Sequence, residues 1–355
     1  EKKLRFEVIK IDKNNNQKNL EDLINIDKIY FSVNYPGLLI GTGTTIEYTP
    51  FNKEKKDNNF KTGLSFDYTT GLPYIPGSGI KGVIRDFFPQ KIEDKNYSEK
   101  EKLKYQEQNE AKMELINQIL ESNYSFEEIE KIKESIFDGR DFREKENLEE
   151  EKFLPIFKRD KFIEGRILVQ DGKQILDKDY ITPHKKILEN PVPIKILKIV
   201  PRTEIEILLQ LTDTKIFVPE KNDIVITKEQ KKKLFTEILF LTGLGAKTNV
   251  GYGHFDQEES IKVTREKVKK LHEKEKKEAL KKEKENMTDS EKFIYEYKNE
   301  WNNETKKKRF NEIDKFEVEE QKEIAKLFLE DFENEEKPSK KTIEKIKKAK
   351  RILNS

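Results

Sequence analysis

A glycine-rich stretch, Leu241–Phe255, constrains the fold of this chain most strongly. Four glycines arrive within eleven positions: Gly243, Gly245, Gly251 and Gly253. Because glycine lacks a Cβ, successive backbone amides in such a loop can turn toward one anion. Lys247, Thr248 and Asn249 add charge and hydrogen-bond donors between the glycines. The stretch is therefore either an anion-binding loop or a tight helix-to-strand turn that needs glycine for its geometry alone.

A nucleotide-binding P-loop is excluded by the spacing of this stretch. Gly245-Ala246-Lys247-Thr248 is similar to the end of a Walker A motif, whose two glycines lie five residues apart. Here those two places hold Leu241 and Ala246, and the stretch follows a helical pattern over Lys228–Leu241 where a P-loop would follow a strand. The sequence therefore does not predict nucleotide hydrolysis.

A second motif lies in Thr70–Phe88, TGLPYIPGSGIKGVIRDFF. Its prolines favour an extended chain, and Ser78 is predicted to cap a helix. Lys81 and Arg85 are four residues apart and share one face of that helix. The opposite face is apolar and consists of Ile80, Val83, Ile84 and Phe87.

The rest of the pattern predicts a mixed α+β chain with polar additions. A charged segment, about 90–151, is predicted to be a helical insertion and a solvated decoration. The strand over Phe162–Val169 is predicted to return through Asp171-Gly172 as a hairpin, about 160–190, because Asp-Gly favours tight hairpin turns. A Lys- and Glu-rich segment, 259–355, is predicted to be a helical extension to a domain over residues 1–258.

Three motifs in order resemble those of the RAMP superfamily of CRISPR effector subunits. They are PYIPGSGIKGVIR, the Asp179–His184 stretch DYITPH, and GLGAKTNVGYG. The sequence of the glycine stretch is most similar to that of the sixth RAMP subunit of the type III-B (Cmr) complex. The likeness covers Ile29–Asp256. It implies a ferredoxin-like, RRM-related fold in which the hairpin near 160–190 forms a thumb across the guide RNA.

The resemblance also implies a function. It indicates a non-catalytic subunit that grips the backbone of guide crRNA and packs on neighbouring RAMP subunits of a Cmr complex in antiviral defence. No cofactor, metal ligand or catalytic residue is expected. The residues expected to contact RNA are Lys81, Arg85, His184, Gly243, Gly245, Lys247, Asn249, Gly251 and Tyr252.

Two other functions stay open at this point. Some RAMP relatives are metal-independent endoribonucleases that process repeat RNA with paired histidines, and here His184 and His254 would have to meet. The sequence places no carboxylate beside His184, which favours a structural or phosphate-contacting role over general-base catalysis. A metal site at Asp171, Asp177 and Asp179 is disfavoured by their mixed charged surroundings. A structural cap that touches no RNA is the third possibility.

Composition limits the function classes further. Of 355 residues, 39% are charged, yet the net charge is only +2, so any basic surface must come from local clustering. The absence of cysteine excludes disulfides, thiolate zinc sites and cysteine nucleophiles. Without a long apolar run or a signal-like start, the sequence predicts a cytoplasmic protein with no membrane partner.

Overall fold

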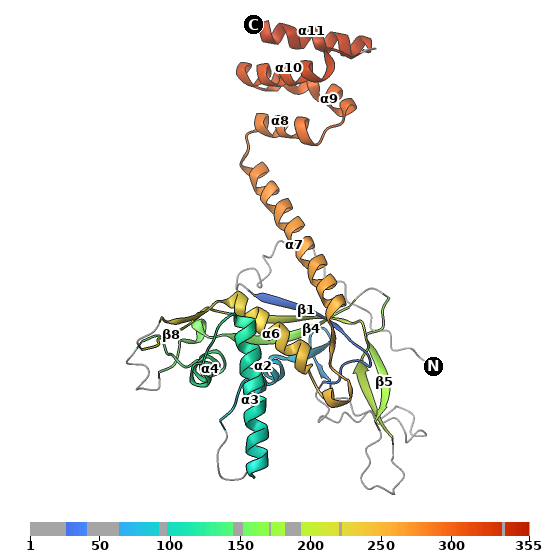
Figure 1. Ribbon diagram of the computed structural model, residues 1–355. Coiled ribbons are helices and arrows are strands. Elements are labelled where there is room, and N and C mark those ends of the chain that lie inside the picture. Colours follow the sequence, from blue (N-terminus) through green and yellow to red (C-terminus); the bar gives the residue numbers. More distant parts are fainter. Residues whose placement is uncertain are drawn as a thin grey trace. The chain divides into compact units, whose positions relative to one another are not determined.

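The computed structural model describes residues 26–40, 64–91, 98–144, 152–169, 172–181, 193–219, 222–335 and 338–354. The chain divides into two compact units, Glu1–Lys267 and Val268–Ser355 (Figure 1). The strands of the described residues all lie in the first unit, and the second unit is helical. The predicted α+β class is therefore confirmed.

The first unit alternates strands with helices. Its strands are β1 (Asp27–Val33), β2 (Ser65–Phe66), β3 (Pro73–Pro76), β4 (Lys161–Leu168), β5 (Leu176–Ile181), β6 (Ile194–Ile199), β7 (Glu204–Gln210), β8 (Thr214–Ile216), β9 (Ile224–Ile226) and β10 (Phe255–Asp256). Its helices are α2 (Gly77–Phe87), α3 (Glu99–Leu120), α4 (Phe126–Lys133), α6 (Lys228–Thr242) and the beginning of α7 (Gln257–Asn286). Shorter helical turns are Glu134–Asp138, Ile156–Lys158 and Thr248–Val250.

A six-stranded sheet in the order β10-β1-β7-β4-β3-β2 forms the centre of this unit, and each neighbouring pair is antiparallel. Two further pairs, β5–β6 and β8–β9, form small separate sheets. In the central register Ile29 and Gly165 both lie opposite Ile207. Alternate residues of β1 and β7 therefore point to the same face and enter one core.

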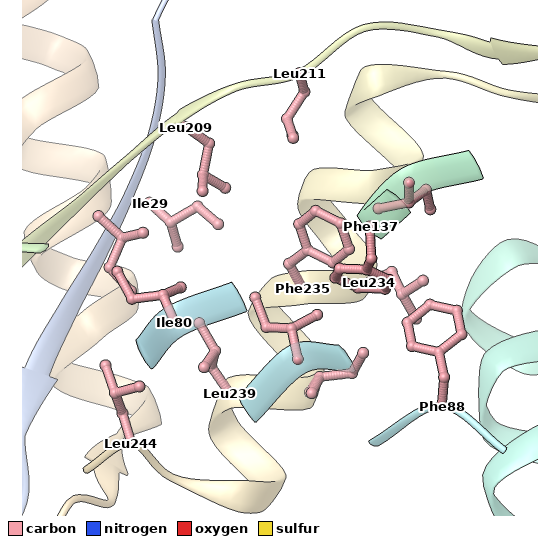
Figure 2. Close-up of a cluster of buried hydrophobic side chains, with 14 of the residues drawn as sticks. Ile29, Ile80, Phe88, Phe137, Leu209, Leu211, Leu234, Phe235, Leu239 and Leu244 are labelled. Atoms are coloured by element: carbon pink, nitrogen blue, oxygen red, sulfur yellow. The ribbon is translucent and has the colours of Figure 1, made fainter. Parts of the chain in front are cut away.

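Helices α2 and α6 contribute to that core. Figure 2 shows Ile80 of α2 and Leu239 of α6 beside Ile29 of β1. These side chains are at most 4% exposed. At the other end of α2, Phe88 contacts Phe137 with ring centroids 5.3 Å apart. The sheet and the two helices therefore form two layers that pack on one another.

The two helices begin in different ways. Thr227 and Gln230 form a capping box at the start of α6, and the helix ends at Thr242 with Gly243 as its C-cap. The N-cap of α2 is Pro76, and no side chain caps this helix. The prediction that Ser78 caps α2 is therefore wrong, because the helix already starts at Gly77 and Ser78 lies inside its first turn.

The described part of the segment predicted as an insertion is largely helical, but it is not only a solvated decoration. Capping boxes begin both of its helices, Ser98 with Glu101 for α3 and Ser125 with Glu128 for α4. The apolar residues at the end of α3 and along α4 join the main core: Ile116, Ile119, Leu120, Ile129 and Ile132. The insertion therefore completes the core of the first unit.

The predicted hairpin through Asp171-Gly172 is wrong in its strand pairing. β4 pairs with β3 and β7 in the central sheet. β5 pairs with β6, as in the partners Asp179 and Ile196. A two-stranded ribbon does exist, but it is formed by residues 176–181 and 194–199 and not by the strand that precedes Asp171.

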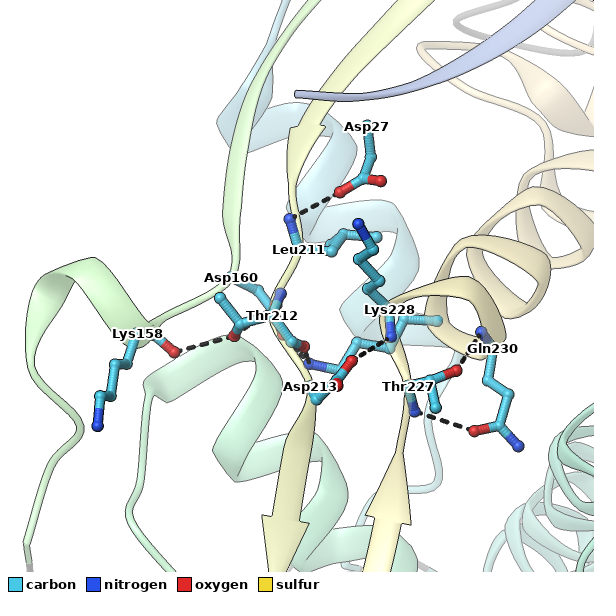
Figure 3. A network of polar contacts seen from close by, with 10 residues as sticks. Asp27, Lys158, Asp160, Leu211, Thr212, Asp213, Thr227, Lys228 and Gln230 are labelled. Atoms are coloured by element: carbon cyan, nitrogen blue, oxygen red, sulfur yellow. Dashed lines mark hydrogen bonds and ion pairs between the residues drawn. The ribbon is translucent and has the colours of Figure 1, made fainter. Parts of the chain in front are cut away.

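A buried ion pair joins Asp160, the residue before β4, to Lys231 of α6. Nζ of Lys231 bonds to a carboxylate oxygen of Asp160, and both side chains are at most 2% exposed. Lys231 also donates to the carbonyl of Thr212, and the amide of Thr212 donates to Asp160. Figure 3 shows the surrounding network, in which Asp213 accepts from the amide of Lys228. Burial raises the pKa of Asp160 and lowers that of Lys231, and their mutual attraction opposes both shifts.

The second unit has its own core. Besides the remainder of α7, its helices are α8 (Asp289–Asn299), α9 (Asn303–Arg309), α10 (Val318–Phe332) and α11 (Lys340–Asn354), with a short turn at Phe310–Lys315. Phe310 and Phe328 pack at a centroid distance of 4.0 Å. The guanidinium of Arg309 lies 4.3 Å from the ring centroid of Trp301. The apolar faces of these helices thus face one another inside the unit.

Across the described ranges, every helix is too short or too polar to cross a lipid bilayer.

Candidate nucleic-acid interface

The glycine stretch forms a loop that is hydrogen-bonded to the segment after β1. The amide of Ala246 donates to the carbonyl of Leu39 at 2.8 Å, and the amide of Gly253 donates to the carbonyl of Gly37 at 2.8 Å. Within the loop, the amide of Leu244 donates to the carbonyl of Gly253. These bonds fix both ends of the loop against the sheet and leave residues 247–250 at its tip.

Two of the glycines are required by close backbone packing. A Cβ on Gly245 would lie 2.2 Å from the carbonyl oxygen of Leu39, and one on Gly253 would lie 2.0 Å from that of Leu244. Both residues also have positive φ, 91° and 77°. This part of the loop is a structural turn, so the geometric reading of the glycines holds here.

The tip of the loop has a backbone conformation that can bind an anion. Lys247 adopts a left-handed conformation with φ 61°, and a single helical turn, Thr248–Val250, follows it. A left-handed residue followed by helical ones turns successive amides to one side and forms an anion-binding nest. In the described part of the chain, the amides of Lys247, Thr248 and Asn249 donate no hydrogen bond. The tip therefore offers three free donors in sequence.

The side chains at the tip suit a phosphate ligand. Lys247 and Asn249 are exposed, and neither makes an ion pair or side-chain hydrogen bond with the described residues. Gly251 closes the turn with φ 95°, and a Cβ there would meet only Pro36, at 3.6 Å. The tip thus combines a free ammonium group with free amides, as charge-assisted binding of phosphate requires.

The hydroxyl group of Tyr252, a residue expected to contact RNA, is hydrogen-bonded within the protein. Its hydroxyl donates to Oδ2 of Asp179 at 2.7 Å, and Nζ of Lys198 bonds to the same oxygen at 2.6 Å. Burial and the bond to Asp179 raise the pKa of Tyr252 to about 12. Burial acts to raise the pKa of Asp179, but the bonds from Lys198 and Tyr252 outweigh it and hold that pKa below its ordinary value. This cluster joins the β5–β6 ribbon to the glycine loop.

The first-turn amides at the start of α2 receive no side-chain cap from the described residues. Because no side chain caps this helix and its first turn contains no acidic residue, its partial positive charge is not offset locally. Ser78 and Gly79 are exposed, and a Cβ on Gly79 would meet nothing within 4 Å. Lys81 is half-buried and makes no ion pair with the described residues. A phosphate could therefore approach this end of the helix closely.

The start of α2 and the glycine loop lie at the same end of the core. Figure 2 shows Ile80 from the first turn of α2 on the same side as Leu244 of the loop, with Leu239 of α6 nearby. Phe88, at the other end of α2, lies toward Phe235 in the first half of α6. The two helices therefore run in opposite directions, which brings the beginning of α2 toward the end of α6.

The structure does not place the remaining predicted residues in a free RNA-binding position. Arg85 forms two bonds with Asp138, of 2.8 and 3.0 Å, so its guanidinium is shared with protein. His184 lies outside the described residues, as does Asp171. Nε2 of His254 lies 3.1 Å from the carbonyl oxygen of Thr248 and supports the loop tip. Among the described residues no cluster of histidines and carboxylates is arranged to hold a metal ion.

Sequence reasoning missed two features of this region. The role of Asp179 as the acceptor for Tyr252 joins residues 73 positions apart, and no local pattern indicates it. The free amides at the start of α2 did leave a signal, namely glycine at two of the first three helical positions without a nearby acidic residue.

Comparison with known proteins identifies the family. The RAMP superfamily profile matches residues 30–256, more than half of the chain. This chain therefore belongs to the RAMP superfamily, as its three motifs predict. No curated protein matches the sequence.

Solved structures similar to the chain include two Cmr structures. One is the cryo-EM structure of the type III-B Cmr-β complex bound to cognate target RNA, with 20% identity and a TM-score of 0.37. That alignment covers 67% of this chain and 61% of the other, so this chain spans less than two thirds of it. The other is the crystal structure of Cmr6 from Pyrococcus furiosus, with 17% identity and a TM-score of 0.28, covering 65% of this chain and 97% of that one.

Proposed function

We propose that this protein is a non-catalytic, RNA-binding subunit of a type III-B CRISPR effector complex that grips guide crRNA and packs on neighbouring RAMP subunits. The observation that carries the proposal is the tip of the glycine loop, where three successive amides and the ammonium group of Lys247 have no partner among the described residues. RAMP membership and the three motifs support the choice of RNA as the ligand.

We also infer a ferredoxin-like arrangement within the first unit. Taking β1, α2, β4, β7, α6 and β10 in chain order gives the βαββαβ sequence of that fold. In the sheet, β7 lies between β1 and β4, and β10 lies on the outer side of β1. β2 and β3 extend the sheet beyond β4 and immediately precede α2.

The proposed contacts are with the RNA backbone and not with its bases. Main-chain amides at the loop tip and at the start of α2 recognise phosphate oxygens, which are the same for every nucleotide. Lys247 and Lys81 add charge without sequence preference. Binding should therefore be insensitive to RNA sequence and should weaken steeply as salt rises.

The test is RNA binding by a pair of single-lysine variants. Lys247→Ala removes one charge-assisted bond, which is expected to cost about 1 kcal/mol, or roughly a fivefold loss of affinity. Lys104→Ala is the matched control, because Lys104 is also exposed and makes no ion pair with the described residues but lies in the first half of α3. Fluorescence anisotropy with single-stranded RNA measures both. Equal affinities for the two variants would remove the loop tip from the interface.

The non-catalytic part of the proposal has its own test. The endoribonuclease alternative needs His184 and His254 to meet; Nε2 of His254 lies against the carbonyl of Thr248, and His184 lies outside the described residues. Purified protein incubated with repeat RNA should leave the RNA intact. Cleavage that is lost in His254→Ala would establish the enzymatic alternative instead.

A further inference from the structure

The C-terminal helix α11 concentrates positive charge. Six lysines and Arg351 stand against one acidic residue, Glu344, so its net charge is +6 over 15 residues. The neighbouring helix α10 has the opposite balance, with five acidic residues and two lysines, a net charge of −3. Because the whole chain has a net charge of only +2, α11 is a strong local concentration of charge.

The cations of α11 fall into two groups. Three are engaged inside the unit: Lys345 with the carbonyl of Lys307, Lys348 with Asp314, and Lys350 with Glu333. The other four make no ion pair or hydrogen bond with the described residues: Lys340, Lys341, Lys347 and Arg351. Opposite charges within the unit therefore neutralise only part of the helix.

Three of the free cations form one exposed stripe. Lys340, Lys347 and Arg351 are spaced seven and four residues apart, which places them on one face of a helix. Thr342 and Ala349 are buried on the opposite face. At a rise of 1.5 Å per residue the stripe is about 16 Å long, enough to follow several phosphates of an RNA strand. Glu344 is the single acidic residue near it.

The stripe is held in place by the core of the second unit. α10 and α11 pack together, and Ala349 is fully buried against a cluster that includes Phe328 and Phe332. The free lysines and Arg351 therefore project from a packed helix and not from an unstructured tail. A fixed row of cations binds a polyanion at a lower entropic cost than a flexible one does.

We propose that α11 is a second RNA-binding surface, which contacts the phosphate backbone through Lys340, Lys347 and Arg351. The proposal rests on the proposed function for the identity of the polyanion as RNA. It goes beyond the family, because the RAMP match ends at residue 256 and α11 begins at Lys340. Single-stranded RNA is the expected ligand, since electrostatic contact with a backbone needs neither a duplex nor a defined sequence.

The test uses the full chain and two double variants of equal charge. Lys347→Gln with Arg351→Gln removes two cations of the stripe. Lys322→Gln with Lys326→Gln removes two cations of α10 that make no ion pair with the described residues, and is the matched control. Affinity for single-stranded RNA is measured by anisotropy over a range of salt concentrations. The α11 variant should lose roughly tenfold in affinity, and its log–log salt slope should fall by about 1.4, from 0.7 for each lost phosphate contact. The α10 variant should match the parent protein.

The outcomes separate this proposal from the previous one. Equal effects of the α10 and α11 variants would show a general charge effect and overturn the proposal. Unchanged RNA affinity together with loss of a neighbouring subunit from the assembled complex would show that α11 docks on protein, which also overturns it. If Lys247→Ala binds RNA normally while the α11 variant binds weakly, the loop proposal fails and this one stands.

Discussion

The hydroxyl of Tyr252 donates a 2.7 Å hydrogen bond to Oδ2 of Asp179 and so joins the glycine loop to strand β5. The same oxygen accepts from Lys198 on β6. One carboxylate thereby holds three segments that are far apart in the chain. The β5–β6 ribbon and the loop tip should consequently move together, which matters because the loop tip is a proposed phosphate site.

Ionisation of Tyr252 provides a direct test of this contact. Its pKa is raised to about 12 from an ordinary value of 10.0. A raised folded-state pKa means that the contact contributes its full stability below pH 10 and loses it as pH rises through 12. The tyrosinate absorbance of the parent and of Tyr252→Phe is measured as a function of pH. The difference between the two titrations reports Tyr252 alone and should have a midpoint near pH 12. A midpoint near pH 10 would contradict the hydrogen bond.

The acidic side of the same contact has the opposite sign. The pKa of Asp179 is held below 3.8, so its contribution to stability is present above that pH and is lost as pH falls. Asp179→Asn should lower Tm at pH 7, and the difference from the parent should shrink below pH 4. If the difference in Tm stayed constant down to pH 2, the charge of Asp179 would have no part in the contact.

Two glycines of the loop should respond differently to alanine. Both Gly245 and Gly251 have positive φ, so each substitution incurs backbone strain of about 1 kcal/mol. Only at Gly245 does the new Cβ also meet a backbone oxygen, that of Leu39, at 2.2 Å. Gly245→Ala should therefore lower the free energy of unfolding clearly more than Gly251→Ala does. Urea denaturation measures both, and equal losses would mean that the loop is not packed on Leu39.

Two glycines of α2 form another matched pair. A Cβ on Gly79 or Gly82 would meet nothing within 4 Å, so alanine at either position should stabilise the helix by about 0.5–1 kcal/mol. Only Gly79 lies in the first turn, where the free amides are. Gly79→Ala should weaken RNA binding, because its methyl group keeps a phosphate from the amides, whereas Gly82→Ala should not. Equal RNA affinities would exclude the start of α2 from the interface.

The buried pair Asp160 and Lys231 should be strongly coupled. Lys231→Met leaves a buried carboxylate without its partner, which is expected to cost about 3–5 kcal/mol. Adding Asp160→Asn removes that charge but keeps an acceptor for the amide of Thr212, so the double variant should be more stable than Lys231→Met alone. Thermal unfolding of the parent, both single variants and the double variant tests the coupling. Additive losses would show that the pair does not interact.

Local patterns predicted much of this fold. The periodicity of Lys228–Leu241 and the apolar face around Ile80 correspond to α6 and α2, because both depend on neighbours within one or two turns. The hairpin predicted from Asp171-Gly172 was wrong in its strand pairing. A turn signal depends only on neighbouring residues, whereas β4 pairs with β7, about forty residues later in the chain. The partner of Arg85 lies 53 residues away at Asp138, and no spacing rule reaches it.

The division of the chain allows a truncation at a defined residue. The sequence places the domain edge near residue 258, but contacts of the first unit continue into α7: the amide of Ser32 donates to Oγ of Ser260, and Lys267 pairs with Glu204. A chain ending at Lys267 keeps both contacts and should unfold cooperatively. A chain ending at Asp256 leaves the buried amide of Ser32 unpaired and should be about 1–3 kcal/mol less stable. Circular dichroism melts compare the two, and a chain ending at Lys267 that lacks a cooperative transition would show that the second unit is needed to fold the first.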